Sequence, residues 1–263
     1  METLSVGERR AEPTAMDTIF DIGMFDGSDT AYYLETGHRV VAVEANPDLV
    51  EQARRRFDAA IVAGRLICVH AAVTADGAPV ELMLAGSDLG SSSLFADKVA
   101  RKRPAGAVEV PGVTIAALIR EHGIPKYLKV DIEGADRYCV LALERATRPR
   151  YLSFEIGEDV DELLAHCASV GYERFKIIHQ NSFREASRVE CLYDRAARRI
   201  MRTLGYAEPT EIRRAGRFFL AGHSSGPVPW QSDGAWQTLE ATRSRLRGPK
   251  LPGWCDIHAT VAS

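Results

Sequence analysis

Short apolar segments alternate with segments of helical periodicity along most of the chain. The apolar segments have the length of strands, whereas the segments between them repeat apolar residues three and four positions apart. This alternation is typical of β-α-β units and predicts an α/β fold around a mostly parallel sheet, with an antiparallel hairpin of the last two strands at one edge. We expect strands at residues 18–22, 39–43, 66–70, 80–84, 127–130, 150–154, 175–179 and 218–221, and helices at 28–35, 46–57, 114–121, 135–145, 159–170 and 238–245.

The pattern weakens at both ends of the chain and in one internal stretch. Residues 1–17 are polar and mixed in charge, so we expect a lead-in that precedes the domain. Residues 180–215 are expected to be a helical insertion, in which arginines around residues 195–203 predict a basic amphipathic helix. The sequence therefore predicts one α/β domain over residues 18–222 and a C-terminal extension over residues 223–263.

Composition and charge exclude several classes of protein. The 263 residues are 46% apolar and 26% charged, as in an ordinary globular protein. The formal net charge of −3 gives no basic excess, so we expect no nucleic-acid partner. No apolar run approaches the roughly 20 residues that cross a bilayer, and the first residues lack the apolar core of a secretory signal, so we expect a cytoplasmic protein with no membrane span. The five cysteines form no CxxC pair, which gives a zinc or redox site little support.

A turn with two glycines follows the first predicted strand and opens the first helix. Gly23 and Gly27 permit a tight turn and a close approach of the backbone to a ligand, and the helix N-terminus adds free N–H groups. Phe25 breaks the GxGxxG pattern of dinucleotide sites, and no P-loop lysine follows. Glu44 ends the second strand, where a carboxylate can accept hydrogen bonds from both ribose hydroxyls of a nucleoside. Together these features favour a nucleoside with an amino-acid tail; for the turn alone, a packing turn in an unrelated α/β protein is the alternative.

Three motifs in order resemble the FkbM family of S-adenosylmethionine (SAM)-dependent O-methyltransferases: residues 21–30 (DIGMFDGSDT), 43–47 (VEANP) and 129–134 (KVDIEG). The resemblance covers about residues 18–220. It implies a Rossmann-like class I methyltransferase fold, with a seven-stranded sheet that ends in an antiparallel hairpin. Many relatives have Ala-Asn after the first glycine, where this chain has Met24-Phe25.

The same resemblance assigns the residues that hold the cofactor. It implies that Gly23, Asp26 and Gly27 surround the methionyl group and ribose of SAM, and that Glu44 holds the ribose hydroxyls. It also implies that two further residues lie near the adenine. The full expected set is Asp21, Gly23, Asp26, Gly27, Glu44, Ala72, Ser92 and Asp131, with Ala72 and Ser92 at the adenine.

Two carboxylates are expected where the methyl group is transferred. Asp131 and Glu155 each end a predicted parallel strand, and ligands of open α/β sheets bind at that edge. Two close carboxylates repel, so one is protonated or a cation lies between them, and Mg²⁺ prefers such oxygen ligands. We therefore expect Asp131 and Glu155 to be catalytic residues and candidate metal ligands, with Glu133, Glu158 and Asp159 as further ligands. The alternative for Asp131 is a helix cap.

An alcohol acceptor needs a general base, and His179 is our first candidate because it ends the predicted strand 175–179. His223, in a loop after the last predicted strand, is the alternative base and a candidate contact of the acceptor. Gln180, Asn181 and Trp230 suit a polyhydroxyl ligand, although the tryptophan can instead fasten the C-terminal segment to the core.

The sequence thus leaves three hypotheses open. The first is a SAM-dependent O-methyltransferase, a monomer or homodimer, that methylates a hydroxyl of a sugar or glycan with the help of a divalent metal and a histidine base. The second is O- or N-methylation of a polyketide or peptide. The third is a non-catalytic SAM-binding protein, against which the paired carboxylates Asp131 and Glu155 argue.

Overall fold

The computed structural model describes residues 16–85, 104–132, 134–186, 196, 211–221, 223–248, 251 and 254–261. Several expectations concern residues outside this part of the chain: Ser92, Glu133, the lead-in before residue 16, and nearly all of the helix at residues 195–203. The domain boundaries proposed from the sequence stay predictions.

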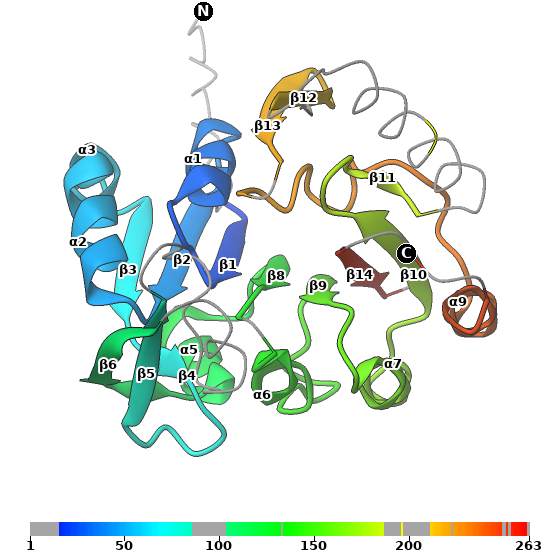
Figure 1. Cartoon of the computed structure of the whole chain (residues 1–263), viewed down its shortest axis with the longest axis horizontal. Helices are drawn as coiled ribbons and strands as arrows, with labels where there is room; N and C mark the ends of the chain where they lie inside the picture. Colours follow the sequence, from blue (N-terminus) through cyan, green and yellow to red (C-terminus); the bar gives the residue numbers. More distant parts are fainter. Residues whose placement is uncertain are drawn as a thin grey trace, which may run out of the picture.

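Five parallel strands make up the first part of an eight-stranded central sheet. Figure 1 shows them side by side from left to right in the order β3-β2-β1-β8-β9. The interior positions of β1, β2, β8 and β9 are buried on both faces, as expected for parallel strands covered by helices, and those of β3 at the edge are partly buried. This order brings the carboxyl ends of β1, β2, β8 and β9 to one edge, as in the Rossmann-like fold that we expected. The strands are β1 (Thr18–Ile22), β2 (Arg39–Glu44), β3 (Leu66–His70), β8 (Tyr127–Val130) and β9 (Tyr151–Glu155).

The antiparallel part of the sheet differs from our expectation. Strand β14 (Cys255–Thr260) lies between β9 and β10 (Arg174–His179) and is antiparallel to both. The two-residue strand β11 (Arg184–Glu185) extends the edge beyond β10, which makes eight strands where we expected seven. The prediction that residues 218–221 pair with β10 is wrong, because β13 (Arg217–Leu220) pairs with β12 (Glu211–Arg214) in a separate sheet.

The pattern of side chains explains this error. Strand β14 alternates polar and apolar residues, and yet all six of its residues are buried, including Asp256 and His258. Buried polar residues hide a central strand from a reading of hydropathy. Phe218 and Phe219 suggest a buried strand because both are apolar, although Phe218 is 67% exposed. Strand β14 also makes residues within 223–263 part of the central sheet.

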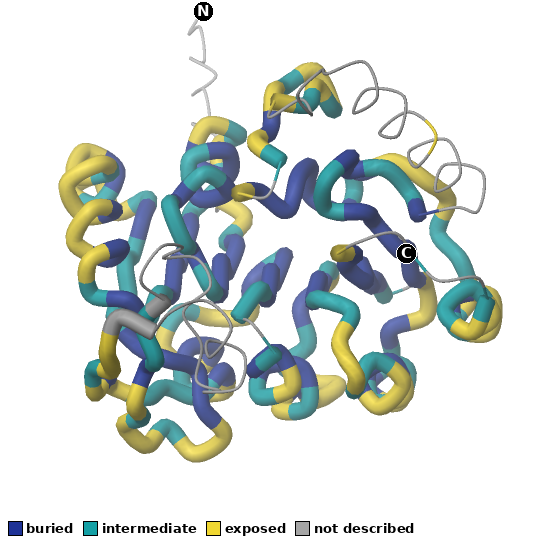
Figure 2. Tube along the Cα trace, in the orientation of Figure 1, coloured by how far each residue is buried: buried dark blue, intermediate teal, exposed yellow. Residues whose placement is uncertain are grey.

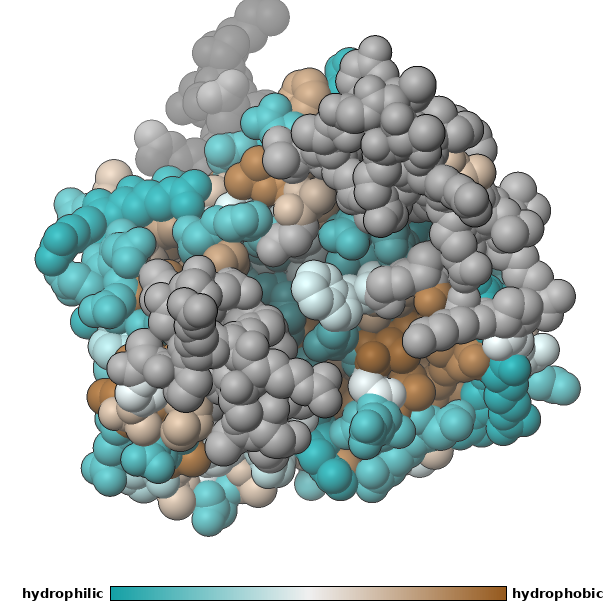
Figure 3. Space-filling view, viewed as in Figure 1, coloured by the Kyte–Doolittle hydropathy of each residue, from teal (hydrophilic) through white to brown (hydrophobic). Residues whose placement is uncertain are grey.

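Helices cover both faces of the sheet and form three layers (Figure 1). One face carries α5 (Ile115–His122), α6 (Asp136–Val140), α7 (Val160–Ser169) and α9 (Leu239–Leu246). The other face carries α1 (Ser28–Glu35), α2 (Pro47–Arg56) and α3 (Asp58–Val62). Figure 2 shows buried strands at the centre and exposed outer helix surfaces, and Figure 3 shows that the outer surface around α2 and α3 is largely hydrophilic. No described helix is long and apolar enough for a bilayer crossing.

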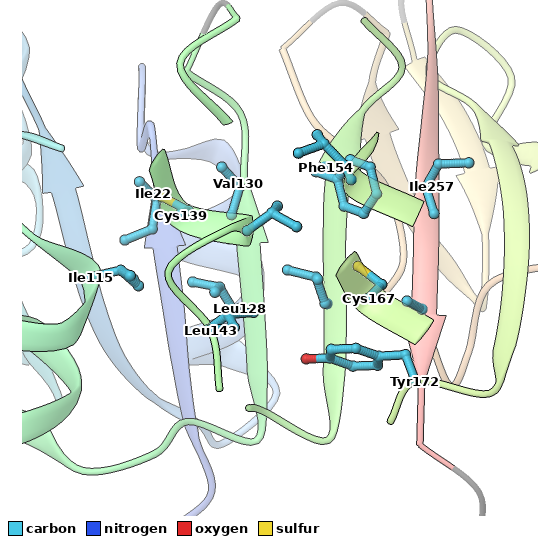
Figure 4. Packing of buried hydrophobic residues seen from close by; sticks show 14 of the residues in the cluster. Ile22, Ile115, Leu128, Val130, Cys139, Leu143, Phe154, Cys167, Tyr172 and Ile257 are labelled. Carbon is cyan, nitrogen blue, oxygen red and sulfur yellow. The ribbon is translucent and has the colours of Figure 1, made fainter. Parts of the chain in front are cut away.

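Two hydrophobic clusters hold these layers together. The first lies between the sheet and α5, α6 and α7, where Leu128, Phe154 and Ile257 of the strands face Cys139 and Cys167 of the helices (Figure 4). These two cysteines are fully buried and pack as small apolar side chains. The second cluster lies on the opposite face, beneath α1.

Side-chain caps explain where two helices begin. The Asn46 side chain accepts a hydrogen bond from the Asp48 N–H at 3.0 Å, at the start of α2. Thr114 Oγ1 accepts one from the Ala117 N–H at 3.1 Å, at the start of α5. The helix expected over residues 135–145 is shorter, because α6 ends at Val140. The remaining short strands pair as β4 (Ala72–Val73) with β7 (Gly112–Val113), and β5 (Val80–Ala85) with β6 (Pro104–Val110).

Candidate active site

The glycine turn is held against the ends of β2 and β8. The Gly23 and Met24 N–H groups both donate to the Val43 carbonyl, at 2.9 and 3.1 Å. Gly23 has a φ of 82°, and a Cβ atom added there would lie 1.9 Å from the Asp131 carbonyl oxygen. No side chain fits between the turn and β8, so the sequence requires glycine at this position. Gly27 forms the N-cap of α1 at the far end of the turn.

The Glu44 carboxylate lies beside this turn. Its Oε2 accepts a hydrogen bond from the Phe25 N–H at 2.9 Å, and its Oε1 accepts one from the Asn46 N–H at 2.8 Å. Burial raises the pKa of Glu44, while these two N–H groups act in the opposite direction. The Asn46 Nδ2 atom is buried without a hydrogen-bond partner in the described part of the chain. A carboxylate fixed at the turn, next to an amide with an unused donor, fits a ligand rich in hydroxyls, as the ribose of SAM is.

Lys129 connects the turn to three carboxylates. Its Nζ atom donates to the Gly23 carbonyl at 2.9 Å and lies 3.0 Å from Asp21, 3.6 Å from Asp29 and 3.9 Å from Asp131. Its side chain is only 4% exposed. Burial acts to lower the pKa of Lys129, but the three carboxylates raise it well above its usual value, so the ammonium group stays charged. Lys129 lies in the 129–134 motif, but we expected no role for its side chain from the sequence.

Residues 223–225, which are distant in sequence, contact the glycine turn and the start of α1. Asp29 accepts hydrogen bonds from the Ser224 hydroxyl and from the Ser225 N–H, the latter at 2.9 Å. His223 Nδ1 lies 3.0 Å from the Asp26 carboxylate, and the His223 ring lies 5.4 Å from the Phe25 ring. His223, which we predicted to be an alternative base, therefore lies at the glycine turn. Sequence reasoning missed Asp29, whose two serine partners are almost 200 residues away.

The carboxyl edge of β8 and β9 carries the predicted pair Asp131 and Glu155. A third carboxylate, Asp256, lies directly opposite Glu155 in the β9–β14 pairing and is buried. Gln180 Nε2 donates to Asp256 Oδ1 at 2.7 Å. Burial raises the pKa of Asp256 well above its usual value, and the charges of Asp131 and Glu155 raise it further. Both effects favour the protonated form of Asp256. The sequence did not reveal it, because it lies on the strand that we did not predict.

His179 is not brought together with these carboxylates. It is 3% exposed, and its Nδ1 atom lies 2.9 Å from the Ser182 hydroxyl. In the pairing of β10 with β14, His179 lies opposite Cys255, one position from Asp256. Successive side chains of a strand point to opposite faces, so His179 and Asp256 belong to different faces of the sheet. Asn181 follows in the turn after β10 and is half-buried.

The described residues do not fit a metal ion. No group of three or more His, Cys, Asp or Glu side chains among them is arranged to hold one. Glu158 is exposed and Asp159 is half-buried. The positive charge nearest to Asp131 among the described ion pairs is the Lys129 ammonium group. We therefore derive no step through a metal.

Two other predicted residues, Ala72 and Trp230, make their described contacts with residues other than Asp131, Glu155 and Asp256. Ala72 is buried in β4, where its N–H donates to the Pro111 carbonyl at 2.8 Å. The centre of the Trp230 ring lies 4.8 Å from the centre of the Tyr151 ring and 6.1 Å from that of the Tyr127 ring. These tyrosines begin β9 and β8, so Trp230 lies towards the opposite end of the strands, in a packing role.

Comparison with known proteins gives one match to a family. Residues 21–174 match the model described as "Methyltransferase FkbM domain". The matched segment holds the glycine turn, Glu44, Lys129, Asp131 and Glu155, and it ends within β10. No curated protein matches the chain by sequence.

Three solved structures show distant similarity. A precorrin-6y C5,15-methyltransferase from Geobacter metallireducens GS-15 is 10% identical, with a TM-score of 0.39 over 94% of this chain and 80% of that chain. A SAM-dependent methyltransferase from Thiobacillus denitrificans, in complex with S-adenosyl-L-homocysteine, is 12% identical, with a TM-score of 0.36 over 94% and 86%. A TehB-like SAM-dependent methyltransferase from Corynebacterium glutamicum ATCC 13032 Kitasato is 11% identical, with a TM-score of 0.35 over 62% and 68%.

Proposed function

Because the chain belongs to the FkbM methyltransferase family and is a SAM-dependent methyltransferase, we propose that it methylates a hydroxyl group of a sugar or glycan. The observation that carries this proposal is the arrangement of two polar sites along one edge of the sheet. The glycine turn with Glu44 suits the cofactor, and the edge with Asp131, Glu155, Asp256 and Gln180 suits an acceptor with several hydroxyls.

We assign the binding of the cofactor to Gly23, Asp26, Gly27 and Glu44. Bound SAM supplies a methyl group that its sulfonium charge has already activated. The Glu44 carboxylate would exchange its present backbone donors for ribose hydroxyls, and Lys129 would keep the turn fixed through the Gly23 carbonyl. A turn positioned in advance lowers the entropic cost of bringing donor and acceptor together.

The acceptor half is assigned to the carboxylates and to Gln180. The Asp131 side chain is 40% exposed, in contrast with the buried Asp21 and Asp256. Asp131 would accept the proton of the acceptor hydroxyl as the hydroxyl oxygen takes the methyl group from the sulfonium sulfur, whose bond to that carbon breaks so that S-adenosylhomocysteine leaves. The Lys129 ammonium group lies 3.9 Å from Asp131, and the protonated form favoured at Asp256 would limit repulsion among the three carboxylates.

The experiment is a screen for methyl transfer to hydroxylated acceptors, read by mass, together with calorimetry of SAM binding. Substituting Asp131→Asn should lower kcat about 100-fold or more, while affinity for S-adenosylhomocysteine changes by less than about twofold. Asp161→Asn is the matched control, because Asp161 is an exposed carboxylate on α7. Absence of SAM binding would refute the cofactor half, and an active Asp131→Asn enzyme would refute the role of the base.

Two finer hypotheses from the sequence are tested in the same assay. His179 as the base predicts that His179→Ala abolishes turnover and removes the acidic limb of the pH profile. Mg²⁺ held by Asp131 and Glu155 predicts that chelation stops turnover. We expect activity to survive both treatments, since His179 is buried on the other face and the described residues form no metal cluster.

A further inference from the structure

One large aromatic side chain is exposed at the same edge as the proposed acceptor site. Trp254 is 60% exposed and immediately precedes β14. The other two tryptophans are partly covered: Trp230 contacts Tyr151, and Trp236 contacts Tyr151 and the Lys176 ammonium group, 4.4 Å from its ring centre. An exposed indole at a ligand-binding edge calls for an explanation, because most of its apolar surface remains in water.

Backbone hydrogen bonds fix the place of Trp254. Its carbonyl accepts a bond from the Gln180 N–H at 3.0 Å, and the next carbonyl, that of Cys255, accepts one from the Ile156 N–H at 2.9 Å. Trp254 therefore continues the ladder of β14 at the point where β9 and β10 end. This is the edge that carries Glu155 and Gln180.

The alternation of side chains brings Trp254 to the carboxylates. Trp254 and Asp256 are two positions apart, so they point to the same face, and Asp256 lies directly opposite Glu155. Gln180 lies opposite Trp254 in the same ladder and reaches Asp256 with its side chain. One face of the edge therefore presents an indole, an amide and two carboxylates from adjacent strands.

This combination matches the chemistry of a sugar ring. A pyranose has an apolar face of C–H groups that packs on an aromatic ring, and a rim of hydroxyls that pairs with amides and carboxylates. We propose that Trp254 is the platform on which a pyranose ring of the acceptor stacks, and that Gln180 and Glu155 orient one of its hydroxyls. This inference rests on the proposed function and replaces Trp230 as the aromatic contact of the acceptor.

The test follows the three indole N–H signals of the ¹⁵N-labelled full-length protein in the presence of S-adenosylhomocysteine. The probes are the methyl glycosides of glucose, galactose, mannose and rhamnose, titrated separately. We expect at least one glycoside to shift the Trp254 signal saturably while the Trp230 and Trp236 signals stay in place. No shift with any probe, or a shift confined to Trp230 or Trp236, would overturn the platform.

Calorimetry with S-adenosylhomocysteine on the same sample separates this inference from the proposed function. Normal cofactor binding without a Trp254 shift refutes the platform alone, whereas loss of cofactor binding refutes the proposed function. With an acceptor found in the mass screen, Trp254→Ala should raise KM about tenfold with kcat nearly unchanged, and Trp254→Phe should restore most of the loss. Phe218→Ala removes another exposed aromatic, on β13, and should leave KM unchanged. Equal effects of Trp254→Ala and Phe218→Ala would contradict the platform.

Discussion

The Lys129 ammonium group shows how a single residue organises the proposed cofactor site. Burial of a charged side chain without a partner of opposite charge is costly. Lys129 is buried together with two acidic side chains, Asp21 and Asp29. The Thr30 hydroxyl also donates to Asp21, at 2.6 Å, and Ser225 donates to Asp29. Each carboxylate therefore has a donor besides Lys129, and Lys129 also bridges both of them to the Gly23 carbonyl.

We predict that Lys129→Met lowers the free energy of unfolding by about 3–5 kcal/mol, because it leaves two buried carboxylates without their cation. Urea denaturation measures this loss. Adding Asp29→Asn to Lys129→Met removes one of the two negative charges and should recover about 1–3 kcal/mol. If the double variant is no more stable than Lys129→Met, the charge argument fails.

At the scale of elements, the contact between the glycine turn and β8 depends on the missing side chain of Gly23. A methyl group there would overlap the Asp131 carbonyl, and the φ of 82° is itself unfavourable for an L-residue. Gly37 provides a matched comparison: its φ is 85°, and an added Cβ would meet no atom within 4 Å.

Gly37→Ala should therefore cost about 1–2 kcal/mol of unfolding free energy, from its φ alone. Gly23→Ala should cost about 3 kcal/mol or more, because the clash with β8 is added, and it should weaken binding of S-adenosylhomocysteine. Chemical denaturation and calorimetry give the two readouts. Similar losses of stability in both variants, with cofactor binding intact, would show that the turn is not pressed against β8.

The strands of the central sheet differ in how well the sequence predicted them. Apolar runs predicted β1, β2, β8 and β9, and the residues that end them gave Glu44, Asp131 and Glu155, because strand ends in a parallel sheet meet at one edge. Strand β14 could not be found from its hydropathy, and Asp256 and the position of Trp254 were lost with it. His179 was misplaced for a related reason, since only the register of β10 against β14 decides which face it joins.

Over the whole molecule, buried titratable groups act on stability in opposite directions. Burial raises the pKa of Asp29 to about 6, and it raises that of Asp136 to about 7, with further effects of neighbouring carboxylates. A carboxyl whose folded pKa is raised binds its proton more tightly in the folded state, so its contribution to stability falls as pH rises from about 4 to its folded pKa. Burial lowers the pKa of His258 to about 3, so its contribution is lost as pH falls below about 6.5. The pH dependence of the free energy of unfolding is the sum of these effects. A variant that removes one titratable group is therefore needed to measure one contribution.

Asp136→Asn isolates the carboxyl effect. Asp136 Oδ1 is buried without a hydrogen-bond partner in the described part of the chain, so ionisation of this carboxyl is poorly compensated. We compare the free energy of unfolding of Asp136→Asn with that of the unchanged protein at each pH. From pH 4.5 to pH 7.5, this difference should shift by about 2–4 kcal/mol in favour of the variant, because the variant does not release this proton. Urea denaturation at the two pH values measures the gain. The exposed Asp233→Asn is the control and should show no such gain. A constant difference between Asp136→Asn and the unchanged protein across this range would mean that the buried carboxyl does not titrate there, and that the acidic edge carries its charge at lower pH than the structure indicates.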